Sequence, residues 1–158
     1  MNVPDFTIPA LLAKISEKLP SWPADQMVVL AMNMGIRFNV FSKSSLETLE
    51  GRVVGFEVLD LSYKTAITHL NGKFWRADVS TAELMIRANA APFLQLLSRQ
   101  EDPDALFFNR TLVLEGDTEL GLIVKNMLDN VDWTAFSESP IGQLLQSKLK
   151  AWLRSISK

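Results

Sequence analysis

The chain of 158 residues is long enough for one compact domain with short terminal additions, and a chain of this size buries roughly two thirds of its unfolded surface. Its formal net charge is -2 and its pI is about 5.4, so it lacks the positive field with which nucleic-acid-binding proteins capture phosphates. The absence of cysteine excludes disulfide bonds, thiolate metal sites and cysteine nucleophiles.

The N-terminal segment predicts a short amphipathic helix that ends where Pro20 and Pro23 interrupt it. Its apolar positions recur at helical spacing and are Leu11, Leu12, Ile15 and Leu19. Charged residues lie among them and the segment contains no long apolar run, so it does not resemble a secretory signal. We therefore expect a cytoplasmic protein.

Residues 27–41 form the most apolar stretch of the chain, with Ser21 as a candidate cap and Pro23 near the first helical turn. Polar residues and a glycine interrupt the stretch, and it falls short of the ~20 apolar residues that span a bilayer. Apolar residues occur almost all round the predicted helix. We expect a buried helix that is covered on several sides.

The pattern changes from helical to alternating after Gly51, where Val54, Phe56 and Val58 share one face. Residues 63–70 and 73–78 predict two further strands, and Asn71-Gly72 between them is a strong hairpin signal because both residues tolerate positive φ. The three segments predict an antiparallel meander.

The second half of the chain predicts strands near residues 84–86 and 112–115, with a helix over 90–100 between them. Asp117 is placed to cap a helix over 118–131. A last helix over 139–157 has a wide apolar arc and a basic opposite side.

The residues offer little for catalysis. The sequence contains no serine-nucleophile motif such as G-x-S-x-G that the only histidine, His69, could serve as a base. His69 is predicted to lie at a strand end or on the surface. With one histidine and no cysteine, no common metal-ligand spacing is present, and no glycine-rich phosphate loop occurs. We expect no metal and no cofactor.

Three segments in the second half carry a family resemblance: 104–110 (DALFFNR), 114–122 (LEGDTELGL) and 124–129 (VKNMLD). They resemble the C-terminal half of sterol carrier protein (SCP-2-like) lipid-binding domains, and within that family the UbiT-type accessory factors of bacterial ubiquinone biosynthesis. The likeness covers roughly residues 27–133. Physically, Glu115, Asp117 and Glu119 are expected to serve as turn and cap groups, and Gly121 to allow close helix packing.

The resemblance implies an α+β fold, in which about five strands form a mixed sheet that helices cover around a hydrophobic cavity. It also implies a division into an N-terminal amphipathic extension (1–22), the sterol-carrier-type domain (23–133) and a basic amphipathic C-terminal helix (134–158).

The function implied is a non-catalytic accessory role in oxygen-independent ubiquinone biosynthesis, in which the protein holds or presents isoprenoid quinone intermediates or membrane lipids. UbiU and UbiV proteins and other pathway enzymes would be its partners, and the hydroxylation chemistry would be theirs. The expected location is the cytoplasm, peripheral to the inner face of the bacterial membrane. Alternatives are a general lipid carrier, a structural adaptor for a biosynthetic complex and, more remotely, an enzyme that uses His69.

Two sets of residues follow as candidates for contact with lipid. Met27, Met32, Met34 and Met127 adapt to irregular apolar shapes and either line a cavity or fill the core. The full set of cavity candidates is Phe56, Val58, Tyr63, Ile67, Phe74, Leu84, Ile86, Phe93, Leu97, Phe107, Leu112, Leu114, Leu120, Val124 and Met127. The candidates for membrane contact are Lys150, Trp152, Leu153, Arg154, Ile156 and Lys158.

Overall fold

The structure, a computed structural model, describes residues 20–97, 101–140, 142–144, 146–148 and 151. The strands are β1 (Val53–Val58), β2 (Tyr63–Leu70), β3 (Lys73–Ala77), β4 (Leu84–Ala88) and β5 (Leu112–Gly116). The α-helices are α2 (Trp22–Arg37), α3 (Lys43–Thr48), α4 (Ala90–Leu97), α5 (Pro103–Phe108), α6 (Thr118–Asp129) and α7 (Trp133–Glu138). Two short 3-10 turns, η1 (Leu59–Leu61) and η2 (Val79–Thr81), connect strands.

The five strands form one mixed sheet in the order β3-β2-β1-β4-β5. The first three strands make the predicted antiparallel meander, and Asn71 and Gly72 turn its hairpin with φ values of 52° and 76°. β4 returns through η2 to pair parallel with β1, and β5 pairs antiparallel with β4. The predicted α+β class and five-stranded mixed sheet are confirmed.

The two faces of the sheet differ in chemistry. Aliphatic and aromatic side chains from all five strands lie on the inner face, whereas a row of alternating charges crosses four strands on the outer face. In that row Glu57 contacts Lys64 at 3.1 Å and Arg87 at 2.7 Å, and Arg87 also contacts Glu115 at 2.5 Å. Opposite charges on neighbouring strands stabilise the pairing and keep the outer face polar.

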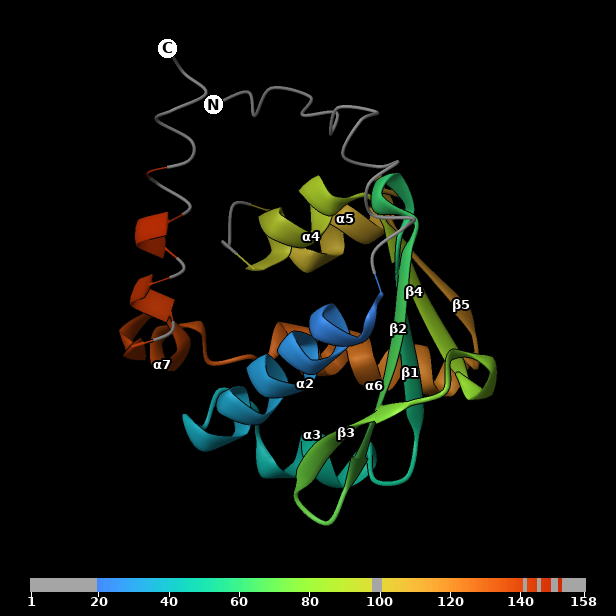
Figure 1. The fold of residues 1–158 in the computed structure, drawn as a ribbon, viewed down its shortest axis with the longest axis horizontal. Helices are drawn as coiled ribbons and strands as arrows, with labels where there is room; N and C mark the ends of the chain where they lie inside the picture. Colours follow the sequence, from blue (N-terminus) through green and yellow to red (C-terminus); the bar gives the residue numbers. More distant parts are fainter. Residues whose placement is uncertain (1–19, 98–100, 141, 145, 149–150, 152–158) are drawn as a thin grey trace.

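The α-helices lie on one side of the sheet (Figure 1). α2 packs on β3 and β2, α6 packs on β4 and β5, and α5 contacts both β5 and α6. The core therefore lies between the inner face and this layer of helices.

The most apolar helix is less covered than predicted. α2 begins at Trp22, its Ser21 hydroxyl makes no capping hydrogen bond, and Met27 and Leu30 are 70% and 60% exposed. The expectation of burial on several sides is thus wrong, because only one side of α2 meets the sheet.

Three six-residue helices, α3, α5 and α7, were not predicted. Ser42 accepts a hydrogen bond from the Ser45 amide at 3.2 Å, Asp102 accepts one from the Asp104 amide at 3.0 Å, and Asp132 accepts one from the Ala135 amide at 3.0 Å. Each helix thus begins at a side-chain cap. The predicted segment 1–19 and residues 98–100 of the 90–100 helix lie outside the described residues.

The segment 114–122 forms the corner between β5 and α6. Gly116 has φ +123°, and the Asp117 carboxylate accepts a hydrogen bond from the Leu120 amide at 2.9 Å. That bond and, to a lesser degree, the nearby Arg52 guanidinium lower the pKa of Asp117 below its usual value. The predicted cap is present. A methyl group on Gly121 would lie 3.6 Å from the nearest atom of Leu84, so this position does not require glycine for close packing.

The two glycines predict opposite effects of alanine substitution. Gly116→Ala should lower the free energy of unfolding by at least about 2 kcal/mol, because a left-handed backbone disfavours a side chain and the new methyl would overlap the Glu83 carbonyl. Gly121→Ala is the matched control and should raise stability by up to about 1 kcal/mol through helix propensity. Urea unfolding measures the free energy of unfolding of both variants. Equal changes in the two variants would contradict the left-handed turn at Gly116 between β5 and α6.

Candidate functional site

The space between the sheet and the helices contains most of the predicted cavity residues. Those buried in a single cluster are Ile67, Phe74, Leu84, Ile86, Leu112, Leu120, Val124 and Met127. Those partly buried against this cluster are Phe56, Phe93, Phe107 and Leu114. Val58 and Tyr63 are partly exposed and lie outside it, and the Leu97 side chain is outside what the structure describes. Their role as lipid contacts stays a prediction.

Other residues of this layer were not among the cavity candidates. α2 and α3 contribute side chains at helical spacing, and α5 and α6 add more; this set is Val28, Val29, Met32, Ile36, Phe41, Leu46, Leu49, Leu106, Ile123 and Leu128. The spacing of Val28, Val29, Met32 and Ile36 was visible in the sequence and identifies the inner side of α2. Of the other methionines proposed for the cavity, Met32 packs on the core, whereas Met27 is exposed.

Polar contacts hold α2 over the edge of the sheet at two points. Near its start, the buried Asp25 carboxylate accepts a hydrogen bond from the Tyr63 hydroxyl at 2.8 Å and pairs with Arg76 at 3.0 Å. Near its middle, the Asn33 side chain bonds both the amide and the carbonyl of Phe74, at 2.8 Å and 2.9 Å. Because β3 is an edge strand, Asn33 supplies hydrogen bonds that a further strand would otherwise make.

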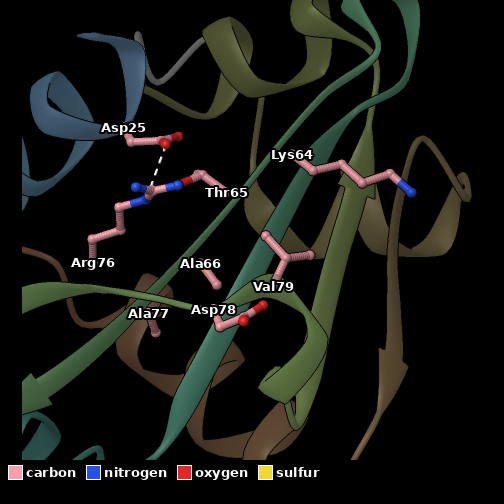
Figure 2. Close-up of a pocket in the computed structure, with 8 residues that line it drawn as sticks. All are labelled: Asp25, Lys64, Thr65, Ala66, Arg76, Ala77, Asp78 and Val79. Carbon is pink, nitrogen blue, oxygen red and sulfur yellow. Dashed lines mark ion pairs between the residues drawn. The ribbon is translucent and has the colours of Figure 1, made fainter. Parts of the chain in front are cut away.

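A polar pocket of about 430 Å³ opens near the start of α2 (Figure 2). Figure 2 shows Asp25 and Arg76 directed toward one another above β2, with Lys64 extending away from them. The four charged groups of the lining have partners: Asp25 with Arg76, Lys64 with Glu57, and Asp78 with Ser80. This arrangement stabilises the junction of α2 and the sheet, and each charged group of the lining already has an ion-pair or hydrogen-bond partner.

A second pocket of about 450 Å³ opens near the end of α2, beside α3 and the β2–β3 turn. Ile36, Phe41 and Leu46 supply apolar walls, and His69 also lines it. His69 lies near the end of β2, as one of its two predicted positions has it, but at 5% exposed it is not on the surface. Its side chain points to the inner face, where Phe74 packs on it with ring centroids 5.1 Å apart.

His69 makes one close polar contact in the described chain. Its Nδ1 lies 2.8 Å from a Glu50 carboxylate oxygen, and the other oxygen of Glu50 accepts a hydrogen bond from the Asn71 amide at 2.8 Å. Both ring nitrogens are buried, and neither has a partner in hydrogen-bond geometry among the described residues. Glu50 thus ties the imidazole to the hairpin turn.

The described part of the chain contains no helix that is both long and apolar enough to cross a membrane. All six predicted membrane-contact residues lie outside the described residues. Of the 139–157 helix, the described positions 140, 142–144, 146–148 and 151 are helical, and Leu144 from its expected apolar arc is 57% exposed.

Comparisons with known proteins agree with this architecture. Residues 39–129 match the model of the SCP-2 sterol transfer family. The chain is 35% identical over 147 residues to the ubiquinone biosynthesis accessory factor UbiT of Escherichia coli strain K12, covering 92% of this chain and 77% of that relative. UbiT of Escherichia coli O157:H7 gives the same values.

Among solved structures, the chain is similar in fold to one described as UbiJ-SCP2 ubiquinone synthesis protein. The two share 21% sequence identity with a TM-score of 0.55, over 70% of this chain and 97% of that one. This likeness concerns the fold alone.

The contact between Tyr63 and Asp25 predicts that the Tyr63 hydroxyl ionises at a higher pH in the folded protein than in the unfolded chain. Burial, followed by the hydrogen bond to Asp25, raises the pKa of Tyr63 from 10.0 to about 12. Since the folded pKa exceeds the unfolded one, this contribution to stability is complete below pH 10 and is lost as pH rises toward 12.

Tyr63 is the only tyrosine, so tyrosinate absorbance measures it without interference. At about pH 11 the folded protein, verified by circular dichroism, should show little tyrosinate, whereas the urea-unfolded chain should be largely ionised. Tyr63→Phe should abolish the signal and flatten the loss of stability over this range. Equal ionisation in folded and unfolded protein would contradict the contact.

Proposed function

Because this chain belongs to the SCP-2 sterol transfer family, we propose that it is a non-catalytic lipid-binding accessory factor of oxygen-independent ubiquinone biosynthesis. The observation that carries this proposal is the 35% identity to UbiT across 92% of the chain. The relatives' names assign ubiquinone biosynthesis to those proteins, and we extend that role to this one.

The lipid would lie in the apolar layer between the inner sheet face and the helices. An isoprenoid quinone intermediate or a membrane lipid gains roughly 0.8 kcal/mol for each CH2-sized group that leaves water. The side chains of this layer pack against one another, so a long chain enters only if a helix moves outward. We propose α2 as that helix, because one of its sides already faces solvent. The polar contacts at Asp25 and Asn33 that hold it on the sheet can be exchanged for hydrogen bonds to water when the helix moves.

A non-catalytic role agrees with the surroundings of the only histidine. Among the described residues, His69 contacts the side chains of Glu50 and Phe74, and neither is a hydroxyl or thiol that the imidazole could activate as a base. Hydroxylation of the quinone ring would be carried out by partner proteins of the UbiU and UbiV type. This chain would hold or present the lipid to them without a metal or cofactor of its own.

Contact with the inner face of the membrane would come from the C-terminal segment. Lys150, Arg154 and Lys158 would each contribute about 1 kcal/mol near an anionic surface, and Trp152 suits the interface. The protein would then be cytoplasmic and peripheral to the bilayer from which its lipid comes.

Deletion of the gene in its host, followed by quinone analysis with and without oxygen, tests the proposed pathway. We expect ubiquinone to fall only in cultures grown without oxygen, because the oxygen-independent route would then lack its lipid-presenting factor. Complementation with the intact gene is the control and should restore the quinone. Unchanged ubiquinone in both conditions would favour a general lipid carrier, and an equal loss in both would contradict the oxygen-independent assignment.

A further inference from the structure

We infer that residues 9–19 dock as an amphipathic helix on the outer side of α2, where they cover Met27, Leu30 and Ala31. The partner of this surface is then a segment of the same chain, which directly precedes α2. The inference goes beyond the proposed function, because it does not depend on the pathway or on the lipid that the protein holds.

The outer side of α2 is an apolar surface that faces solvent. Met27 is 70% exposed and Leu30 is 60% exposed, and Ala31 on the same side of the helix is also exposed. The sequence has no charged residue between Asp25 and Arg37, although 22% of the chain is charged. A helix on the surface of a domain normally carries charged or polar residues on its outer side. The apolar outer side of α2 therefore requires a partner.

The segment that precedes α2 has an apolar stripe of its own. Its apolar residues at helical spacing are Leu11, Leu12, Ile15 and Leu19, and Lys14 and Lys18 lie off that stripe. A helix over residues 9–19 is marginal in water by itself, because isolated helices need about 12–15 residues. A surface to pack against is thus what would make this segment helical.

The two apolar stripes are mirror images about Ser21. Counted outward from Ser21, apolar residues occur two, six, nine and ten positions away on both sides. The pairs are Leu19 with Pro23, Ile15 with Met27, Leu12 with Leu30, and Leu11 with Ala31. When a short loop joins two antiparallel helices, positions at equal distance from the loop lie side by side. The spacing therefore brings the stripe of the segment against the outer side of α2.

The connection between the two helices has a suitable length. Pro20 interrupts the helical pattern, and Pro20 and Ser21 form a loop within the range of about two to five residues that joins antiparallel helices. A helix over residues 9–19 would be about 16 Å long, and α2 is about 24 Å long. The segment would therefore reach from the start of α2 to the level of Ala31, which is the part where Met27 and Leu30 are exposed.

A second copy of the chain fits the same surface less well. The outer side of α2 measures about 24 Å by 10 Å, far less than the roughly 800 Å² per partner that a stable interface buries. A segment joined to α2 by Pro20 and Ser21 has an effective concentration on the order of millimolar, well above that of the protein in dilute solution. The tethered segment is therefore the favoured occupant.

The docked segment is compatible with movement of α2. It would pack on the side of the helix that faces away from the sheet, so it would leave the polar contacts of Asp25 and Asn33 unchanged. An outward movement of α2 would carry the segment with it.

Disulfide formation in the full chain tests the contact directly. The chain contains no cysteine, so two introduced cysteines form the only intramolecular disulfide. Ile15→Cys with Met27→Cys joins a facing pair. Ala13→Cys with Met27→Cys is the matched control, because Ala13 has nearly the same separation from Met27 but lies on the opposite side of the expected helix.

The measured quantity is the effective concentration of each cysteine pair in a glutathione redox buffer at micromolar protein. We expect a value at least about tenfold higher for the facing pair than for the control, because docking holds its two side chains within disulfide distance. Equal values would mean that the segment has no fixed position on α2 and would overturn the inference. Disulfides that join two chains would instead assign the surface to a second copy.

Hydrogen exchange measured by mass spectrometry gives an independent reading. Amides of residues 9–19 in the original chain should exchange at least about tenfold more slowly than in an unstructured peptide. Leu30→Asp places a charge in the docking surface and should remove this protection. Leu122→Asp on α6 is the matched control, since Leu122 is 58% exposed, and it should keep the protection. Full protection in folded Leu30→Asp would contradict the docking.

A lipid bilayer is the rival partner that the same measurement separates. The inference requires protection of residues 9–19 in solution without lipid. Protection that appears only after addition of vesicles of phosphatidylethanolamine and phosphatidylglycerol would assign the segment to a membrane surface and would overturn the inference.

Discussion

A sheet with one apolar face and one charged face determines where every other element of this structure lies. The row formed by Lys64, Glu57, Arg87 and Glu115 lies on the solvent side of the sheet, because the cost of removing these charges from water would exceed the free energy of their mutual attraction. The helices must therefore cover the opposite face. This constraint produces a single layer of apolar side chains, closed by helices on one side only.

α2 differs from the other covering helices in how it is held. It lies over the edge strand, its outer side keeps Met27 and Leu30 in solvent, and Asp25 and Asn33 fix its position by polar contacts. A pocket opens at each end of it. These hydrogen bonds and the ion pair hold α2 in one defined position on the sheet. Because they can be exchanged for hydrogen bonds to water, α2 can also move outward at a modest cost in free energy.

Local patterns gave much of this fold from the sequence alone. Strand alternation, the Asn71-Gly72 turn and the Asp117 cap each depend on neighbouring residues, and all three are present. α3, α5 and α7 were not predicted because six residues show too little periodicity, although the sequence contains a capping residue before each of them. The contacts of the candidate site could not be predicted from local patterns, because they join distant segments. Asp25 contacts Tyr63, 38 residues away, and Asn33 contacts Phe74, 41 residues away. The burial of His69 likewise depends on packing that no local pattern contains.

The central claim is that the layer between sheet and helices accepts an apolar guest. Solvent extraction and mass spectrometry of the protein purified from its native host test this most directly, with a soluble protein of similar size purified in parallel as the control. The account predicts an isoprenoid quinone intermediate or a membrane lipid in stoichiometric amount in this protein and none in the control. Protein that folds, is purified gently and contains no apolar ligand would contradict it.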